Sequence, residues 1–233
     1  NMASNDPLCW LNKEIKLKNI DMSILRKYNY KLESNSCNSI INQIEDCIKK
    51  DTDVQDLRRG TEKRIFNFEN ISPEIKLLCE NLIRDIPLKS STFKLDTCLA
   101  IKNKPIKNHE DQLFGWHLDQ VRDQFKIFVY LNDVDILSGP TEFISGTNSF
   151  YEKISGILNY KYIKISDFFK KEKYRSYMNI DRDYVKKKLK KYDIISLLAS
   201  KGEVFFANTS SIHRARPCEK KVRYALTLYL NSW

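Results

Sequence analysis

An alternating stretch near the C-terminus, VRYALTLYL from Val222 to Leu230, decides the fold. Residues two apart on a β-strand point to the same side, so this stretch has two distinct faces. One face is apolar and carries Val222, Tyr224, Leu226, Leu228 and Leu230. The other face is mixed and carries Arg223, Ala225, Thr227 and Tyr229. The pattern predicts a strand that turns one face to a hydrophobic core and the other to a pocket.

Three earlier stretches resemble it in composition. FKIFVYL, from Phe125 to Leu131, is almost continuously apolar and aromatic, which is typical of a strand that is covered on both sides. The segments from Thr92 to Ile101 and from Val204 to Ala207 are also rich in residues that favour strands. We therefore expect a mainly β core between Thr92 and the C-terminus.

The first ninety residues predict helices. Ser36 to Lys50 places Ile40, Ile44 and Cys47 along one side of a helix with a polar opposite side. Ser72-Pro73-Glu74 is a helix start, because serine is a good N-cap and proline is tolerated in the first turn. We interpret residues 1–90 as a mostly helical scaffold for the strands that follow.

Residues 151–193 differ from both neighbours. This segment holds thirteen Lys and Arg against six Asp and Glu, together with seven Tyr. We expect a helical insertion on the strand scaffold, bordering the pocket. No internal repeat or low-complexity linker is visible, so residues 1–233 are predicted to form one domain with the β core in 92–233.

Composition narrows the class of protein. Of 233 residues, 42% are hydrophobic, which is enough for one core, and no apolar run is long enough to span a membrane. Charges at Lys13, Glu14 and Lys16 interrupt any secretory pattern. The six cysteines show no C-x-x-C pair, which argues against a zinc site or a disulfide framework. A cytoplasmic location with free thiols is expected.

The net charge of +10 favours anionic partners without identifying one. Lys, Asn, Ile and Tyr are all frequent, as in an AT-rich genome, and this coding bias accounts for about half of the excess charge. The densest cluster, Lys186 to Lys191, is most simply a solvated helix face. A phosphorylated or CoA-linked small molecule, an anionic polymer and nucleic acid remain open as its partners.

Three residues carry the predicted chemistry. His117 and Asp119 are two apart, so on a strand both side chains reach the same metal ion, and His213 follows a second predicted strand. Two histidines and one carboxylate form the facial triad of non-haem Fe(II) oxygenases, which leaves coordination positions open. The third histidine, His109, lies in a polar run and is predicted to be a loop residue.

Arg223 follows His213 by ten residues, on the mixed face of the last strand. A buried guanidinium at that position grips a carboxylate through two hydrogen bonds, which lysine does less specifically. A dicarboxylate such as 2-oxoglutarate then reaches both the iron and Arg223. Thr141 and Thr227 are candidates for further contacts with the co-substrate, although lining the barrel explains them equally well.

Four landmarks in chain order give the sequence a family resemblance. They are Trp116-His117-Leu118-Asp119; Leu131-Asn132-Asp133-Val134 with Gly139-Pro140-Thr141; Gly146-Thr147; and Gly202-Glu203-Val204-Phe205-Phe206 with His213 and Arg223. Together they resemble the phytanoyl-CoA dioxygenase family of Fe(II)- and 2-oxoglutarate-dependent oxygenases. The resemblance covers Thr92 to the C-terminus.

The resemblance implies a double-stranded β-helix, a jelly-roll barrel of the cupin type, with flanking helices and iron at one mouth. It also implies Fe(II), 2-oxoglutarate and O2 as cofactor and co-substrates, with release of succinate and CO2. Family halogenases replace the carboxylate with a small residue, so Asp119 favours hydroxylation. Asn148 and Arg214-Ala215-Arg216 depart from the family pattern, which affects the surroundings of the co-substrate and substrate.

The expected function is hydroxylation of a small or carrier-linked substrate, and anionic molecules are among the candidates. One alternative is a jelly-roll binding protein that keeps the metal ligands without activity. Another is a nucleic-acid-modifying oxygenase of the same chemistry. Neither the substrate nor the oligomeric state follows from the sequence.

Overall fold

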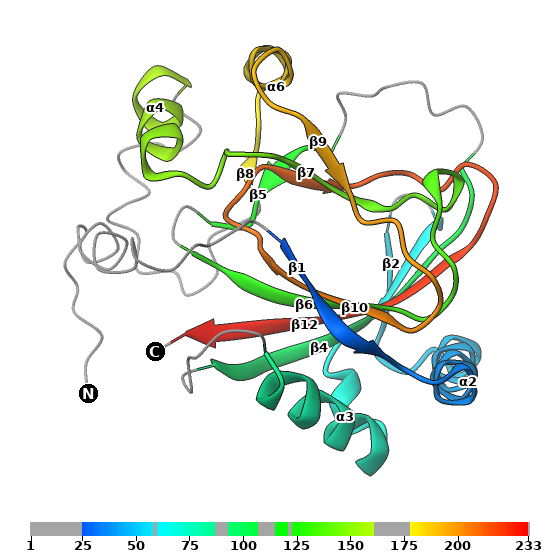
Figure 1. The fold of residues 1–233 in the computed structure, drawn as a ribbon. Helices are drawn as coiled ribbons and strands as arrows, with labels where there is room; N and C mark the ends of the chain where they lie inside the picture. Colours follow the sequence, from blue (N-terminus) through cyan, green and yellow to red (C-terminus); the bar gives the residue numbers. More distant parts are fainter. Residues whose placement is uncertain are drawn as a thin grey trace.

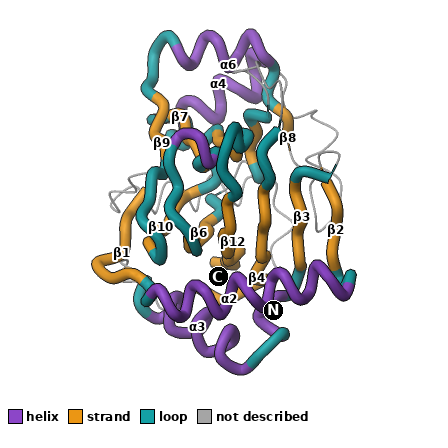
Figure 2. Tube along the Cα trace, turned by 90° about the vertical axis from the view of Figure 1, so that its right-hand side faces the viewer, coloured by secondary structure: helices purple, strands orange, loops and turns teal. Residues whose placement is uncertain are grey.

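Two antiparallel sheets face each other in the computed structural model, and helices cover the outer side of each (Figures 1 and 2). The structure describes residues 25–57, 60–86, 93–106, 115–120, 123–160 and 178–232. The larger sheet has the strand order β1-β10-β6-β12-β4-β3-β2. Its strands are β1 (Leu25–Lys31), β2 (Val54–Leu57), β3 (Glu62–Ile65), β4 (Phe93–Asn103), β6 (Phe125–Tyr130), β10 (Glu203–Asn208) and β12 (Arg223–Ser232).

The smaller sheet has the order β8-β5-β11-β7-β9. Its strands are β5 (His117–Leu118), β7 (Thr141–Ile144), β8 (Met178–Asn179), β9 (Ile194–Ser196) and β11 (His213–Ala215). From β4 onward the chain passes back and forth between the sheets, so that β4, β6, β10 and β12 face β5, β7, β9 and β11. This is the jelly-roll, or double-stranded β-helix, that the sequence predicted.

The last strand has the two faces that its alternation predicted. Leu226, Leu228 and Leu230 belong to the largest hydrophobic cluster, which also includes residues of the helices. Ala225, from the opposite face, packs between the sheets with Phe128 and Tyr130 of β6. The interior of the barrel is therefore lined by the mixed face, and Arg223 begins it.

Helices α2 (Ser34–Lys50) and α3 (Pro73–Arg84) cover the outer face of the larger sheet (Figure 1). Ile40 and Ile44 of α2 and Leu82 of α3 are buried in the same cluster as β12. Ser72 accepts a hydrogen bond from the Ile75 amide, which confirms it as the N-cap of α3. Burying these apolar stripes against the sheet supplies most of the stability of such helices.

Three strands accompany these helices in residues 1–90, which the sequence indicated as a mostly helical scaffold without marking any strand. β2 and β3 extend the sheet beyond β4, and β1 pairs with β10 at the opposite edge. Their sequences, such as EKRI in β3, lack the apolar alternation that marks a strand. Gly202, just before β10, packs against Leu32, just after β1. Only glycine suits this position, because its φ is +85° and a Cβ there would lie 2.2 Å from the Leu32 carbonyl oxygen.

The insertion contributes helices α4 (Phe150–Tyr160) and α6 (Arg182–Leu189) on the outer side of the smaller sheet (Figure 2). Residues 161–177, and also His109, lie outside the described residues. Every helix within the described ranges is too short or too polar to cross a lipid bilayer. Five cysteines, all buried, are free thiols: Cys37, Cys47, Cys79, Cys98 and Cys218.

Candidate active site

The small sheet brings the three predicted metal ligands together. His117 begins β5 and His213 begins β11, and these two residues are direct partners in the antiparallel pairing of the strands. Their ring centroids are 4.2 Å apart. Asp119 follows β5 directly, and its carboxylate oxygens lie 4.0 Å from Nε2 of His117 and 3.5 Å from Nε2 of His213.

One donor atom from each residue lies within 4.8 Å of the other two, as a shared metal ion requires. Ligands that each lie about 2 Å from a common ion are necessarily within a few ångströms of one another. Both histidines are buried, and Asp119 is nearly so. The cluster therefore fits a transition-metal ion held by two imidazoles and one carboxylate.

Backbone carbonyls orient both imidazoles in the same way. Nδ1 of His117 lies 2.8 Å from the Gly115 oxygen, and Nδ1 of His213 lies 2.9 Å from the Ser211 oxygen. A proton on Nδ1 donates to the carbonyl and leaves the lone pair of Nε2 directed into the cluster. Burial lowers the pKa of His117 and of His213 below the ordinary 6.5, so both rings are neutral and ready to bind metal.

Asp119 is ionised. Burial opposes the charge, but the ammonium of Lys126 and the two imidazoles outweigh it and hold the pKa of Asp119 well below its ordinary value. Lys126 comes from β6, and its Nζ lies 2.6 Å from Oδ2 of Asp119. The carboxylate thus has a cation on one side and the two histidines on the other.

Arg223 has donors to spare in the interior of the barrel. It is only 4% exposed, and its Nη2 donates to Oδ1 of Asn103 on the neighbouring strand β4 at 2.8 Å. Among the described residues, Nε and Nη1 of Arg223 have no hydrogen-bond partner although both are buried. An unsatisfied buried guanidinium costs about 1–3 kcal/mol or more, so an anionic ligand at this position would remove a penalty.

Asn103 fixes the orientation of Arg223. Its Nδ2 donates to Oε2 of Glu62 on β3 at 3.0 Å, and this bond leaves Oδ1 for the guanidinium. Glu62 in turn pairs with Arg64. The relay spans three adjacent strands, so Arg223 is held by the sheet rather than by a loop.

Thr141 and Thr227 line the barrel as the sequence allowed. Thr141, at the start of β7, is buried, and its hydroxyl accepts a hydrogen bond of 3.1 Å from the Tyr130 hydroxyl. Its amide donates to the same Tyr130 oxygen at 3.0 Å. Thr227 is buried on the face of β12 that carries Arg223. Thr141 is thus bound to Tyr130, a residue that sequence reasoning did not single out.

Lys126 and Asn103 were also missed, and each had a signal. Lys126 is the one charged residue in a strand that is otherwise apolar and aromatic, FKIFVY, and a lysine buried on such a strand needs a partner. Asn103 shows no comparable pattern in the sequence. Its role depends on strand pairing, because it lies directly opposite Arg223 in the register of β4 and β12.

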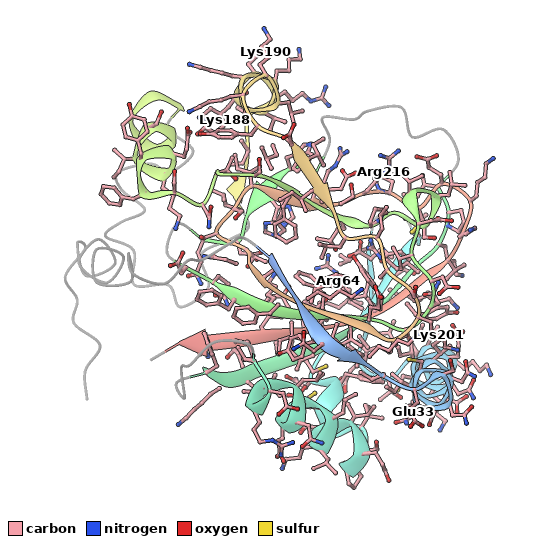
Figure 3. The ribbon with its side chains drawn as sticks, viewed as in Figure 1. Glu33, Arg64, Lys188, Lys190, Lys201 and Arg216 are labelled. Carbon is pink, nitrogen blue, oxygen red and sulfur yellow. The ribbon has the colours of Figure 1, made fainter. Side chains whose placement is uncertain are left out.

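The basic insertion uses part of its charge internally. Glu152 of α4 pairs with Lys188 of α6 and with Lys191, and it accepts a hydrogen bond from the Tyr192 hydroxyl. Figure 3 shows Lys188 at the side of α6 nearer to α4 and Lys190 pointing away from the barrel. The lysine cluster therefore consists of residues that hold the insertion together and others that face solvent.

No protein-family model matches the sequence, and no curated protein is close enough in sequence to count as a relative. Solved structures do match. The non-heme alpha-ketoglutarate-dependent carbocyclase SnoK from nogalamycin biosynthesis is 14% identical with a TM-score of 0.61, over 99% of this chain and 84% of its own.

HygX from Streptomyces hygroscopicus, solved with nickel and 2-oxoglutarate bound, is 12% identical with a TM-score of 0.61, over 94% of this chain and 86% of its own. EctD from S. alaskensis, solved with 2-oxoglutarate and 5-hydroxyectoine, is 13% identical with a TM-score of 0.65, over 100% of this chain and 79% of its own. At these identities the similarity establishes a shared jelly-roll fold.

Proposed function

We propose that this protein is an Fe(II)- and 2-oxoglutarate-dependent dioxygenase of the phytanoyl-CoA dioxygenase type. His117, Asp119 and His213 hold the iron in this proposal, and Arg223 binds the distal carboxylate of 2-oxoglutarate. Thr141 and Thr227 make further contacts with the co-substrate in this proposal. The substrate is a small or carrier-linked molecule, and the reaction is hydroxylation with release of succinate and CO2.

One observation carries the proposal: a His-Asp-His cluster occurs in one barrel with a buried arginine, two nitrogen atoms of which have no partner among the described residues. A plain metal-binding protein has no need for the arginine, because burying an unsatisfied guanidinium destabilises the fold. A dicarboxylate that chelates the metal at one end and reaches Arg223 at the other uses both features. Structures of the same fold with nickel or 2-oxoglutarate bound, such as HygX, support this pairing.

The bound iron and co-substrate would supply the oxidising power for the reaction. The residues of the chain supply position and charge. The Gly115 and Ser211 carbonyls fix the tautomer of the two imidazoles, so that both Nε2 atoms face one point. Asn103 holds Arg223 in the barrel wall, and the aromatic interior, including Phe128 and Phe143, excludes water from the site.

The carboxylate at position 119 is the reason for preferring hydroxylation to halogenation. The neighbouring structures include a carbocyclase and a hydroxyectoine complex, so the fold accommodates more than one outcome. The assignment to a hydroxylase therefore rests on Asp119 and on the sequence landmarks.

Anaerobic titration of the Fe(II)-loaded protein with 2-oxoglutarate tests the proposal. Bidentate chelation of iron by this co-substrate produces a weak visible charge-transfer band, which we expect to appear and saturate. In Arg223→Ala the lost charged hydrogen bonds should raise the concentration needed for half-saturation about 10- to 100-fold. Iron affinity should stay unchanged, because Arg223 is not a ligand.

Arg84→Ala is the control, since Arg84 is an exposed arginine at the end of α3, on the outer side of the larger sheet, and pairs with Asp85. It should titrate like the wild type. If iron binds and no band forms at any concentration of 2-oxoglutarate, the oxygenase proposal fails. The binding protein without activity then becomes the better description.

A further inference from the structure

Lys126 is a buried cation beside the three proposed metal ligands. The proposed reaction gives this lysine no role. It is 4% exposed and faces the barrel interior from β6. Its Nζ lies 2.6 Å from Oδ2 of Asp119 and 3.9 Å from the centre of the Tyr229 ring. Tyr229 on β12 and Ala207 on β10 are its direct neighbours in the sheet.

The charges around Lys126 indicate what else the site would bind. Buried charges in proteins are normally paired, because desolvating an unpaired ion costs several kcal/mol or more. Among the described residues, Lys126 has one carboxylate partner, Asp119, and that carboxylate is also the single anion among the three proposed metal ligands. The two histidines are neutral, so they offer no compensation. A divalent ion and the ammonium would therefore share one negative charge.

Binding of 2-oxoglutarate does not remove the excess of positive charge. A divalent ion, Lys126 and Arg223 together carry four positive charges, whereas Asp119 and the two carboxylates of 2-oxoglutarate carry three negative ones. Over the residues that the structure describes, one positive charge remains near the buried Lys126. The group that would balance it is a single anionic group close to Lys126.

We propose that Lys126 is the anion-binding group of the substrate pocket, and that the substrate carries a carboxylate or phosphate near the carbon that is oxidised. This inference rests on the proposed function, and it narrows the substrate class. Asp119 and Tyr229 both lie against the ammonium, and because an ammonium has three donors, at least one is left for the substrate. Lysine suits this role because its compact charge on a flexible stem can serve two anions at once.

Anion binding by Lys126 can be measured without turnover in the protein loaded with Co(II) and 2-oxoglutarate. Inorganic phosphate and acetate are titrated separately at constant ionic strength, and the visible bands of Co(II) report changes around the metal. We expect saturable binding of at least one of the two anions to the wild type. The affinity should fall about tenfold or more in Lys126→Met, because a buried charged hydrogen bond is lost. Whichever anion binds more tightly identifies the group on the substrate.

Lys188→Met is the matched control. Lys188 is also a buried lysine that pairs with a buried carboxylate, Glu152, and its Nζ lies 4.7 Å from the centre of a tyrosine ring. Removing it causes a similar loss of stability but should leave anion binding unchanged. Lys126→Arg keeps the charge and should retain binding within severalfold. Lys126→Gln, which keeps a donor but no charge, should behave like Lys126→Met and serves if the methionine variant does not fold.

The outcomes are distinct. If phosphate and acetate bind to Lys126→Met as tightly as to the wild type, the inference is wrong. It is also wrong if neither anion binds to the wild type. If 2-oxoglutarate itself does not bind to the Co(II) protein, the proposed function fails first, and this is seen before any anion is added. Weaker binding in Lys188→Met as well as in Lys126→Met would also overturn the inference, because the effect would then be one of general stability.

Discussion

Glu152 shows how one residue ties the insertion together. Its carboxylate pairs with Lys188, lies 2.9 Å from Nζ of Lys191 and accepts a hydrogen bond of 2.6 Å from the Tyr192 hydroxyl. Burial by itself would raise the pKa of Glu152. The bonds from Lys188, Tyr192 and Lys191 outweigh burial and lower the pKa from 4.5 to about 2.

This lowered pKa makes the contribution of Glu152 depend on pH. A carboxylate whose folded pKa lies below its unfolded value stabilises the fold above the unfolded pKa, and the benefit is lost as the pH falls through the folded pKa. Glu152→Gln should therefore lower the free energy of unfolding by about 3 kcal/mol near neutral pH. The deficit should shrink progressively below about pH 5. Urea unfolding of both proteins across this range measures it.

Asp183→Asn is a suitable comparison, because Asp183 is an exposed acidic residue of α6 that pairs loosely with Lys186. Its effect on unfolding should be small at every pH. A deficit in Glu152→Gln that is the same at acid and neutral pH would contradict the account of Glu152.

At the scale of elements, the turn between β10 and β11 positions His213, and Asp123 anchors that turn. Oδ1 of Asp123 accepts hydrogen bonds from Asn208 at 2.8 Å, from Ser210 at 3.1 Å and from Lys153 of α4 at 3.1 Å. The backbone adds a bond of 2.7 Å from the Thr209 amide to the Gln124 oxygen. The segment after Asp119 and the turn before His213 are thus fastened to each other and to the insertion.

Asp123→Ala should weaken metal binding because this fastening sets the distance between the ligands. Groups that support metal ligands typically contribute about 10- to 100-fold in metal affinity, and we expect a loss in that range. Isothermal titration of the protein with Ni(II) measures it. Asp123→Asn keeps an acceptor for Asn208 and Ser210 and should recover part of the loss.

Asp135→Ala provides the comparison for this experiment. Asp135 likewise receives several bonds, from the Leu137 and Ser138 amides and from Lys221, but it caps a short helix that carries no metal ligand. Its loss should reduce stability and leave Ni(II) affinity unchanged. Wild-type affinity in a folded Asp123→Ala protein would show that the turn holds His213 without help.

At the scale of the whole molecule, the β core was predictable because its main strands have sequences typical of strands. β6 and β12 have strand-favouring sequences, and the alternation of β12 gave its correct core and pocket faces. β2 and β3 were not predicted, because their short, charged sequences VQDL and EKRI form strands only by pairing, β3 with β4 and β2 with β3. Local pattern cannot reveal a partner that is distant in sequence.

In the candidate site, too, some residues were predictable from the local sequence and others only from the structure. His117, Asp119 and His213 were predicted from residue type and spacing, and the structure gathers them as that spacing required. Asn103 contacts Arg223, which is far away in the sequence, so its role depends on the register of β4 against β12. Lys126 contacts Asp119, so its role depends on how β6 lies against the end of β5. The segment 151–193, expected as a helical insertion, contains strand β8 as well as most of α4 and all of α6, and only the structure shows that Glu152 pairs with Lys188.

The distribution of the site over two sheets predicts how ligands should stabilise the molecule. The three proposed metal ligands begin or follow strands of the small sheet, and Arg223 begins a strand of the large one. A metal ion alone would therefore strengthen the pairing of β5 with β11. A dicarboxylate that spans the metal and Arg223 would also connect the sheets across the barrel, and it needs the metal to do so.

Thermal unfolding followed by circular dichroism separates these two steps. At a free Ni(II) concentration about 100 times the dissociation constant, binding stabilises the folded state by about 2.7 kcal/mol. For a chain of this size that should raise Tm by roughly 5–11 °C. 2-Oxoglutarate should add a further increase in the presence of Ni(II) and none in its absence. His213→Ala should lose both increases, whereas Arg223→Ala should lose the second alone. An increase with 2-oxoglutarate that survives in Arg223→Ala would mean that the dicarboxylate is held within the small sheet, and the link between the sheets would have to be abandoned.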